Sequence, residues 1–123
     1  MIEVPELTLS YLAAPYSDPD PLVVADRMER LCKADAKLMK KGIFTVSPLL
    51  KHFIIQHEQL PGDWEYWRDY SAALLCGVDR VYVLMLPGWK ESIGVSAEIR
   101  LATDVGIPIL YINELGDVEV QNE

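Results

Sequence analysis

The chain has 123 residues, half of them hydrophobic, and a formal net charge of −8 at pH 7. This is enough material for one domain whose core needs neither disulfides nor metal. The acidic charge disfavours a protein that binds a nucleic acid polymer or an anionic membrane, because both partners require clustered Lys and Arg. A small molecule is the better candidate ligand.

Cysteine usage and the N-terminus indicate a cytoplasmic protein. Cys32 and Cys76 lie far apart, without CxxC spacing and in apolar helical surroundings, so we expect two reduced core residues. The N-terminal stretch "MIEVPELTL" lacks the basic and apolar regions of a signal peptide, and no stretch approaches the ~18 apolar residues of a membrane span.

The first part of the chain reads as a strand, a helix and a second strand. Residues 7–14 are apolar and β-prone, and Asp20 and Pro21 are a plausible N-cap and first residue of a helix that ends at Lys41. The apolar face of this helix repeats at helical spacing and comprises Val24, Met28, Leu31, Ala34 and Leu38. Residues 43–47 follow as a strand, and 48–62 as a less regular connection with a possible helical turn.

The second part of the chain again alternates helices and strands. A helix begins after Asp63, and the strand at 80–86 is apolar almost throughout, which is typical of a central strand. The next helix spans about 92–105 and is closed by Gly106, and 108–112 is the last clear strand. Residues 113–123 form a polar tail that either adds an edge strand or stays mobile.

This order predicts a single α/β domain over residues 1–123, a three-layer sandwich with a mostly parallel sheet of four to five strands. In such sheets ligands bind beyond the carboxyl ends of the strands, where the strand order reverses. The loops "AAPYSDP" (13–19) and "PGWKES" (87–92) are placed for this role. Ser17 and Gly88 are therefore candidate substrate contacts.

Glu98 is unusual because it lies on the apolar side of its helix. Val95, Ile99, Ala102 and Val105 form the stripe that should be buried, and Glu98 projects close to its centre. A buried carboxylate costs several kcal/mol unless it is paired or faces a solvated pocket. The helix N-terminus helps it to stay ionised, and Gly94 would allow a ligand to approach the backbone.

The common nucleotide and metal motifs are missing. There is neither GxxxxGK[ST] nor GxGxxG, and the five-residue spacing of His52 and His57 does not stack them on one helical face. No Ser-His-Asp set can be argued from spacing. We therefore expect no cofactor and no metal.

Three segments together resemble one enzyme superfamily. "SYLAAPYS", "GVDRVYVLMLPGW" and "SIGVSAE" are similar, in this order, to segments of the nucleoside 2-deoxyribosyltransferase superfamily, which includes 2'-deoxynucleoside 5'-phosphate N-hydrolases. The chain looks closest to a small branch with an LPGW…SxGxxxE motif. The resemblance covers most of the chain and implies a flavodoxin- or Rossmann-like fold.

The resemblance also implies roles for individual residues. The glutamate of the SxGxxxE motif attacks the anomeric carbon and expels the base, and Glu98 is its matching position. Tyr11 matches an aromatic residue that borders the sugar. Ser92 would face the sugar or its phosphate, and Trp89 offers a surface on which a base could stack.

Two positions depart from the superfamily's pattern. The aspartate that orients the sugar or base falls on Ser71 when counted back from Asp79, and Asp69 could replace it only if the helix starts later or is irregular. The loop after the first strand is acidic where the nucleotide hydrolases have an arginine. A phosphate would be repelled there unless Arg27 or a neighbouring subunit compensates.

Several of these residues also have a purely structural interpretation. Glu98 could be a partly exposed helix residue without a catalytic task, and Tyr11 a core side chain. Trp64 and Trp67 share a stripe with Leu74 and Leu75, which favours core or subunit-interface positions over base stacking.

The sequence thus predicts an N-glycosidic bond enzyme that acts on a small-molecule nucleoside or nucleotide. The alternative is a catalytically silent binding module of the same fold, and a third reading is a surface for assembly around Trp64 and Trp67. The resemblance further implies a homo-oligomer, either a dimer or a tetramer.

Overall fold

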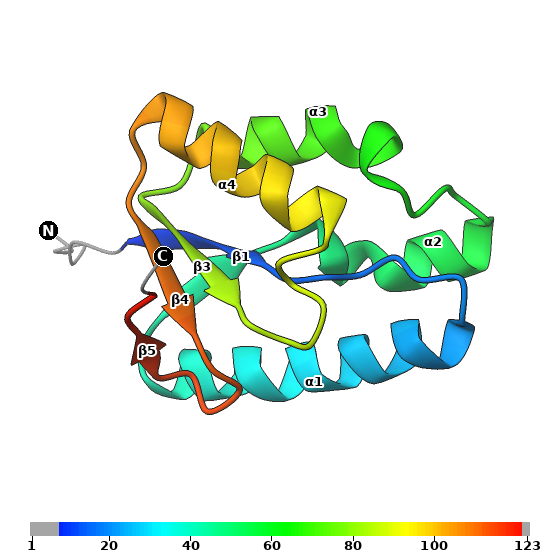
Figure 1. Cartoon of the computed structure of the whole chain (residues 1–123), viewed down its shortest axis with the longest axis horizontal. Helices are drawn as coiled ribbons and strands as arrows, with labels where there is room; N and C mark the ends of the chain where they lie inside the picture. The colour runs from blue at the N-terminus through cyan, green and yellow to red at the C-terminus, as the bar shows by residue number, and fades with distance from the viewer. Residues whose placement is uncertain (1–7, 122–123) are drawn as a thin grey trace, which may run out of the picture.

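A computed structural model describes residues 8–121 and shows an α/β fold built on one five-stranded sheet (Figure 1). In chain order the elements are β1 (Leu9–Ala13), α1 (Pro21–Lys40), β2 (Phe44–Val46), the 3-10 helix η1 (Pro48–Lys51), α2 (His52–Glu58), α3 (Trp64–Leu75), β3 (Arg80–Leu84), α4 (Ile93–Val105), β4 (Ile109–Ile112) and β5 (Val118–Glu119). The predicted three-layer sandwich with a mostly parallel sheet is confirmed.

The strand order is β2-β1-β3-β4-β5. The pairs β1/β2, β1/β3 and β3/β4 are parallel, and β5 joins β4 as an antiparallel edge strand. The chain leaves β1 for β2 on one side and returns to β3 on the other side. The carboxyl ends of β1 and β3 therefore form the point at which the strand order reverses.

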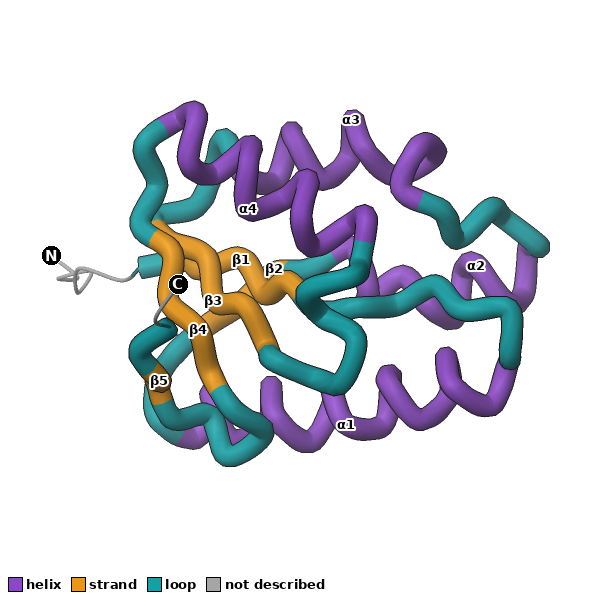
Figure 2. Tube along the Cα trace, viewed as in Figure 1, coloured by secondary structure: helices purple, strands orange, loops and turns teal. Residues whose placement is uncertain are grey.

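Alternating residues of the strands supply two cores. Leu12, Tyr82 and Leu84 pack with Leu31 and Leu38 of α1 on one face of the sheet. Tyr11, Val81 and Val83 point to the other face, where α3 and α4 cover them (Figures 1 and 2). The period of two along each strand explains this division.

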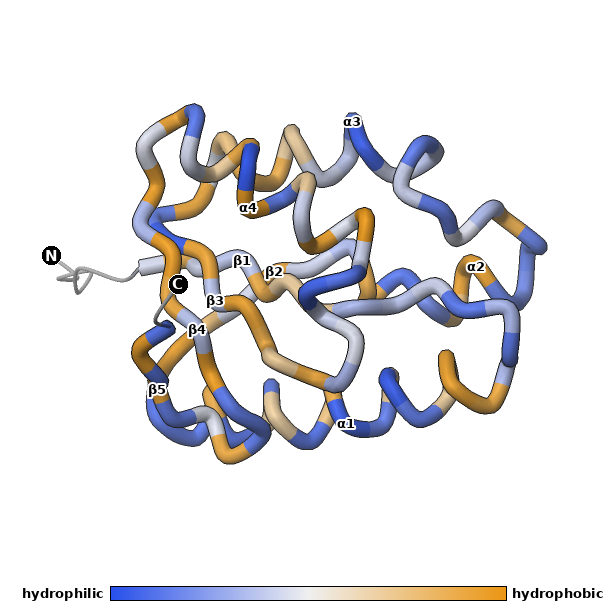
Figure 3. Tube along the Cα trace, in the orientation of Figure 1, coloured by the Kyte–Doolittle hydropathy of each residue, from blue (hydrophilic) through white to orange (hydrophobic). Residues whose placement is uncertain are grey.

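Helix α1 follows the sequence prediction closely. The Asp20 side chain accepts a hydrogen bond from the Leu22 amide at its N-terminus, and Pro21 is the first helical residue. The predicted apolar stripe faces the sheet, with its last three members fully buried. Figure 3 shows the matching alternation of hydrophobic and hydrophilic residues along α1.

Other predictions need correction. Cys32 and Cys76 are exposed rather than buried, because Cys32 follows Leu31 on α1 and points away from the sheet, while Cys76 caps the end of α3. Val105 is also exposed, since α4 has reached its last turn and no longer covers the sheet. The connection at 48–62 is more helical than predicted. It contains η1, which Ser47 caps and Pro48 begins, and α2, which follows η1 directly.

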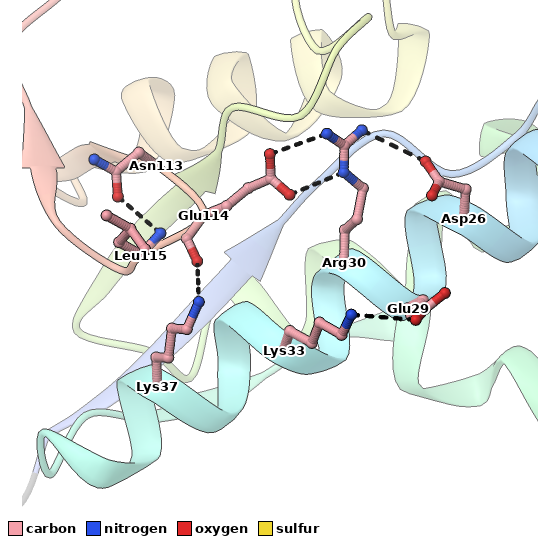
Figure 4. Close-up of polar contacts among 8 residues, drawn as sticks. All are labelled: Asp26, Glu29, Arg30, Lys33, Lys37, Asn113, Glu114 and Leu115. Carbon is pink, nitrogen blue, oxygen red and sulfur yellow. Dashed lines mark hydrogen bonds and ion pairs between the residues drawn. The ribbon is translucent and has the colours of Figure 1, made fainter.

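The segment after β4 is anchored to α1 (Figure 4). Arg30 forms an ion pair with Glu114 at 2.9 Å, Lys37 donates to the Glu114 carbonyl, and Lys41 pairs with Asp117. The tail therefore adds the edge strand β5, one of its two predicted alternatives. No helix within residues 8–121 is long and apolar enough to cross a membrane.

Candidate active site

A cavity of about 650 Å³ opens where the strand order reverses. The loop after β1, the loop after β3 and the N-terminal parts of α3 and α4 line it. This is the place at which open parallel sheets bind ligands, and both predicted loops contribute to it.

Glu98 and Tyr11 meet at the cavity although they lie 87 positions apart. Helix α4 presents Glu98 on its buried face between Val95 and Ala102, and only 7% of the residue is exposed. Tyr11 is fully buried in β1, and its hydroxyl donates a hydrogen bond to Oε2 of Glu98. The buried glutamate thus has a hydrogen-bond partner and also borders a cavity. These are the two conditions under which a buried carboxylate is tolerated.

Burial controls the protonation of this pair. Removal from water raises the pKa of Glu98 from 4.5 to about 8, and the hydrogen bond from Tyr11 acts in the opposite direction. Burial and the neighbouring negative charge of Glu98 raise the pKa of Tyr11. The tyrosine therefore keeps its proton when the carboxyl group ionises, and it remains a donor to that group.

The start of α4 forms one wall of the cavity. Ser92 caps the helix, because its hydroxyl accepts from the Val95 amide at 3.2 Å. Ser92, Ile93 and Gly94 all line the cavity. The Ile93 and Gly94 amides have no hydrogen-bond partner within residues 8–121, and they favour a negatively charged or polar ligand group here.

Helix α3 forms the opposing wall through Trp64, Trp67 and Ser71. These residues recur at helical spacing, and Ser71, at the inner end of the row, is fully buried beside Tyr11. Both tryptophans are half-buried and line the cavity, so they are not core residues, and their predicted alternative position at a subunit interface stays a prediction. The face of α3 that carries the two tryptophans borders the cavity and is not packed into the core.

Asp69 is not brought to the cavity. Its side chain is 96% exposed and lies 3.6 Å from the Arg68 guanidinium, on the solvent side of a regular helix. The proposed replacement of the sugar-orienting aspartate by Asp69 is therefore not supported by its position. Ser71 occupies the inward-facing position instead.

Trp89 also lies outside the cavity. Its ring packs against Tyr111 at a centroid distance of 5.5 Å, and Lys90 lies above it. It belongs to the apolar layer on the α3 and α4 face of the sheet. The neighbouring Gly88 does line the cavity. A base can therefore be stacked by Trp64 or Trp67, but not by Trp89 in this arrangement.

Arg27 enters the cavity from α1. Its Nη1 donates to the carbonyl oxygens of Tyr16 at 3.3 Å and Ser17 at 2.9 Å. Its Nε is buried and finds no hydrogen-bond partner among residues 8–121. The guanidinium approaches Gly88 so closely that a Cβ there would lie 2.9 Å from Nη2, and Gly88 has a φ of +91°. The backbone conformation therefore favours glycine here, whereas the contact involves only the flexible end of the Arg27 side chain.

Ser17 lines the same end of the cavity. Its hydroxyl donates to the Gly62 carbonyl at 2.5 Å and so ties the loop after β1 to the segment before α3. Arg27 was named in the sequence only as compensation for an acidic loop. The position of Arg27 along α1 did not predict that its side chain would reach the loop after β3.

The two histidines lie away from Glu98. His52 Nδ1 is 2.7 Å from the Tyr16 hydroxyl, behind the loop after β1. Within the part of the chain that the structure describes, no three His, Cys, Asp or Glu side chains are grouped so that they could hold a metal ion.

The chain matches a known protein family over most of its length. A family model described as "Domain of unknown function (DUF1937)" matches residues 8–114. A search of curated proteins finds no match. The likeness to nucleoside 2-deoxyribosyltransferases accordingly stays a prediction from the sequence motifs, and the geometry of the site must carry the functional argument.

Proposed function

The chain belongs to the DUF1937 family, and we propose that it cleaves the N-glycosidic bond of a deoxynucleoside or deoxynucleotide, with Glu98 as nucleophile. One observation carries this proposal. Glu98 is a buried carboxyl group at the floor of a cavity large enough for a nucleoside, and Tyr11 holds it in place.

In the proposed reaction an oxygen of Glu98 attacks the anomeric carbon while the C–N bond breaks and its electron pair leaves with the base. Tyr11 donates to Oε2, and Oε1 receives no hydrogen bond from residues 8–121, so Oε1 is the attacking atom. Water then hydrolyses the glycosyl-enzyme intermediate, or a second base accepts the sugar. Hydrolase and transferase differ only in this second step.

The raised pKa of Glu98 bears on this mechanism. With a pKa of about 8, most of the carboxyl group is protonated at neutral pH in the empty cavity. Positive charge that develops on the sugar in the transition state favours the ionised form. The nucleophile therefore becomes active with rising pH or with substrate binding.

The remaining residues fit a nucleoside or its 5'-phosphate. Trp64 and Trp67 provide aromatic surfaces for the base. Arg27, together with the first turn of α4, supports an anionic group at the other end of the substrate, because its Nε lacks a partner. Arg27 is one of the two sources of compensation for the acidic loop that the sequence analysis named, the other being a neighbouring subunit.

A second candidate is a binding module of the same fold without catalysis. Ser71 stands where the resemblance leads us to expect an aspartate, and Asp69 points to solvent, so the sugar lacks a carboxylate to orient it. This candidate predicts that a nucleoside raises the melting temperature without release of base. A cytoplasmic location and a homo-oligomer, dimeric or tetrameric, remain proposals from the sequence.

The decisive test follows free base by chromatography. The purified protein is incubated with deoxynucleosides and their 5'-monophosphates, with and without an acceptor base. We expect base release, and a loss of about a thousandfold or more in Glu98→Ala. Asp104→Asn, an exposed acidic position on the same helix, should retain activity.

Undiminished turnover in Glu98→Ala would remove Glu98 from the mechanism. Thermal stabilisation by one ligand, with no base released anywhere in the panel, would favour the binding module. Exchange of bases without net hydrolysis would identify a transferase.

A further inference from the structure

The charged side chains that line the cavity are mostly acidic. Within residues 8–121 the acidic members are Asp18, Asp63, Glu65, Glu91 and Glu98, and the one basic member is Arg27. A cavity with this balance attracts positive charge and repels negative charge.

Of the outer acidic groups Asp63, Glu65 and Glu91, only Glu65 has an ion-pair partner within residues 8–121, which is Arg68 at 3.9 Å. Asp63 occupies the N-cap position of α3, yet its side chain makes no capping hydrogen bond. Glu65 follows in the first turn of α3, and Glu91 directly precedes the cap of α4. All three are exposed and lie near helix N-termini at the mouth of the cavity.

The tryptophans bring aromatic faces to the same wall. The Trp64 ring lies 3.9 Å from where a Cβ on Gly94 would be, one helical turn from Glu98. Trp67 Nε1 donates to the Pro61 carbonyl at 2.7 Å, which fixes the orientation of its indole ring. Tryptophan is the aromatic side chain that binds cations best. Aromatic faces and carboxylates on one helix therefore select for the same property, a flat group with positive charge.

Arg27 does not cancel this selection. It comes from α1, on the opposite face of the sheet from α3, and its Nη1 is held by two loop carbonyls. Its charge acts on the part of a ligand that lies against the loops after β1 and β3. The wall formed by α3 retains its negative character.

We infer that the preferred substrate carries a positively charged base, as in an N-alkylated purine deoxynucleoside. This inference rests on the proposed N-glycosidic function and names its substrate class. A positively charged base can also leave without a general acid. This matters because, within residues 8–121, no lysine or histidine lines the cavity next to Glu98 to protonate a departing base.

The step balances without a proton donor. The Glu98 oxygen forms a bond to the anomeric carbon, the C–N bond breaks, and its electron pair remains on the ring nitrogen. A cationic base thereby leaves as a neutral molecule. A neutral base would leave as an anion, close to Asp63, Glu65 and Glu91, and would be repelled by them.

The test compares 1-methyl-2'-deoxyadenosine, cationic at neutral pH, with 2'-deoxyadenosine. Binding is measured by calorimetry and by quenching of tryptophan fluorescence, and base release by chromatography. We expect the cationic nucleoside to bind about three to ten times more tightly, and the ratio to fall in Asp63→Asn and Glu91→Gln and with added salt. Asp104→Asn is the matched control that should leave the ratio unchanged.

The outcomes separate this inference from the proposed function. Equal or weaker binding of the cationic nucleoside, together with Glu98-dependent release of neutral adenine, would overturn the inference and leave the function standing. Preferential binding without release of either base would support the charge preference and contradict the catalytic proposal. A preference that survives in both acidic variants would show that the carboxylates do not cause it.

Discussion

At Glu98, burial opposes the ionised form that a nucleophile requires. The free-energy cost of ionising the buried Glu98 is large, since each pKa unit corresponds to about 1.4 kcal/mol and the pKa of Glu98 rises from 4.5 to about 8. Tyr11 reduces it by donating to the carboxylate. A protein without use for this carboxyl group would be more stable with an apolar side chain here. Its presence at the cavity therefore supports the proposed role of Glu98.

The Tyr11 hydroxyl should set the pH at which Glu98 becomes active. In Tyr11→Phe the hydrogen bond that lowers the pKa of Glu98 is lost, so the pKa rises further. We expect the midpoint of the pH–rate profile to move to higher pH, and the rate at neutral pH to fall about tenfold, the worth of one hydrogen bond to a charged group.

The direction of the profile also tests the role of Glu98. A nucleophile gains activity as the pH rises through about 8, whereas a general acid loses it. Tyr82→Phe is a suitable control, because Tyr82 is buried on the opposite face of the sheet. An unchanged midpoint in Tyr11→Phe would mean that the hydroxyl only fills space.

At the scale of elements, α4 presents both Glu98, the proposed nucleophile, and the polar end of the cavity. Its N-cap at Ser92 and its left-handed C-cap at Gly106 fix where the helix begins and ends. The position of Glu98 relative to β1 depends on this start. A change in the first turn of α4 should therefore move Glu98.

Loss of the α4 cap should weaken the site as well as the fold. Ser92→Ala leaves the Val95 amide without its partner, and we expect the free energy of unfolding to fall by about 1 kcal/mol. The comparison is Asp20→Ala, which removes the equivalent cap of α1. Denaturant unfolding should show similar losses in both variants.

Only Ser92→Ala should also reduce base release or ligand binding, because only α4 carries Glu98. Equal effects of the two caps on the site would mean that general stability, and not the start of α4, determines function.

At the scale of the whole molecule, the buried carboxyl group couples folding to pH. Between 4.5 and about 8 the folded protein keeps a proton on Glu98 that the unfolded chain has released. Raising the pH through this interval therefore favours unfolding. The contribution of Glu98 to stability is complete below the lower value and is lost as the pH approaches 8.

Glu98→Gln provides the measurement, because glutamine has nearly the same shape and does not titrate. Chemical unfolding at pH 5 and pH 8 should show the wild type losing about 4 kcal/mol relative to Glu98→Gln, while other groups cancel in the difference. A constant difference across this range would show that water reaches the carboxyl group and that its pKa is ordinary.

The sequence by itself determined the local structure. Apolar spacing placed α1 and its buried face, and the signals at Asp20, Pro21 and Gly106 fixed helix ends within about a residue. The same spacing identified Glu98 as a carboxyl group on a buried face, which the structure confirms. These features depend on the order of residues along one element, and periodicity reports that order directly.

Only the tertiary structure decided which residues surround Glu98. Spacing placed Trp64 and Trp67 on one face of α3 but could not show that a cavity, and not the core, covers this face. It equally could not show that Trp89 turns to Tyr111 or that Arg27 reaches Gly88. These contacts join residues from separate elements. They follow from the strand order and the packing of helices on the two faces of the sheet, and no local pattern encodes either.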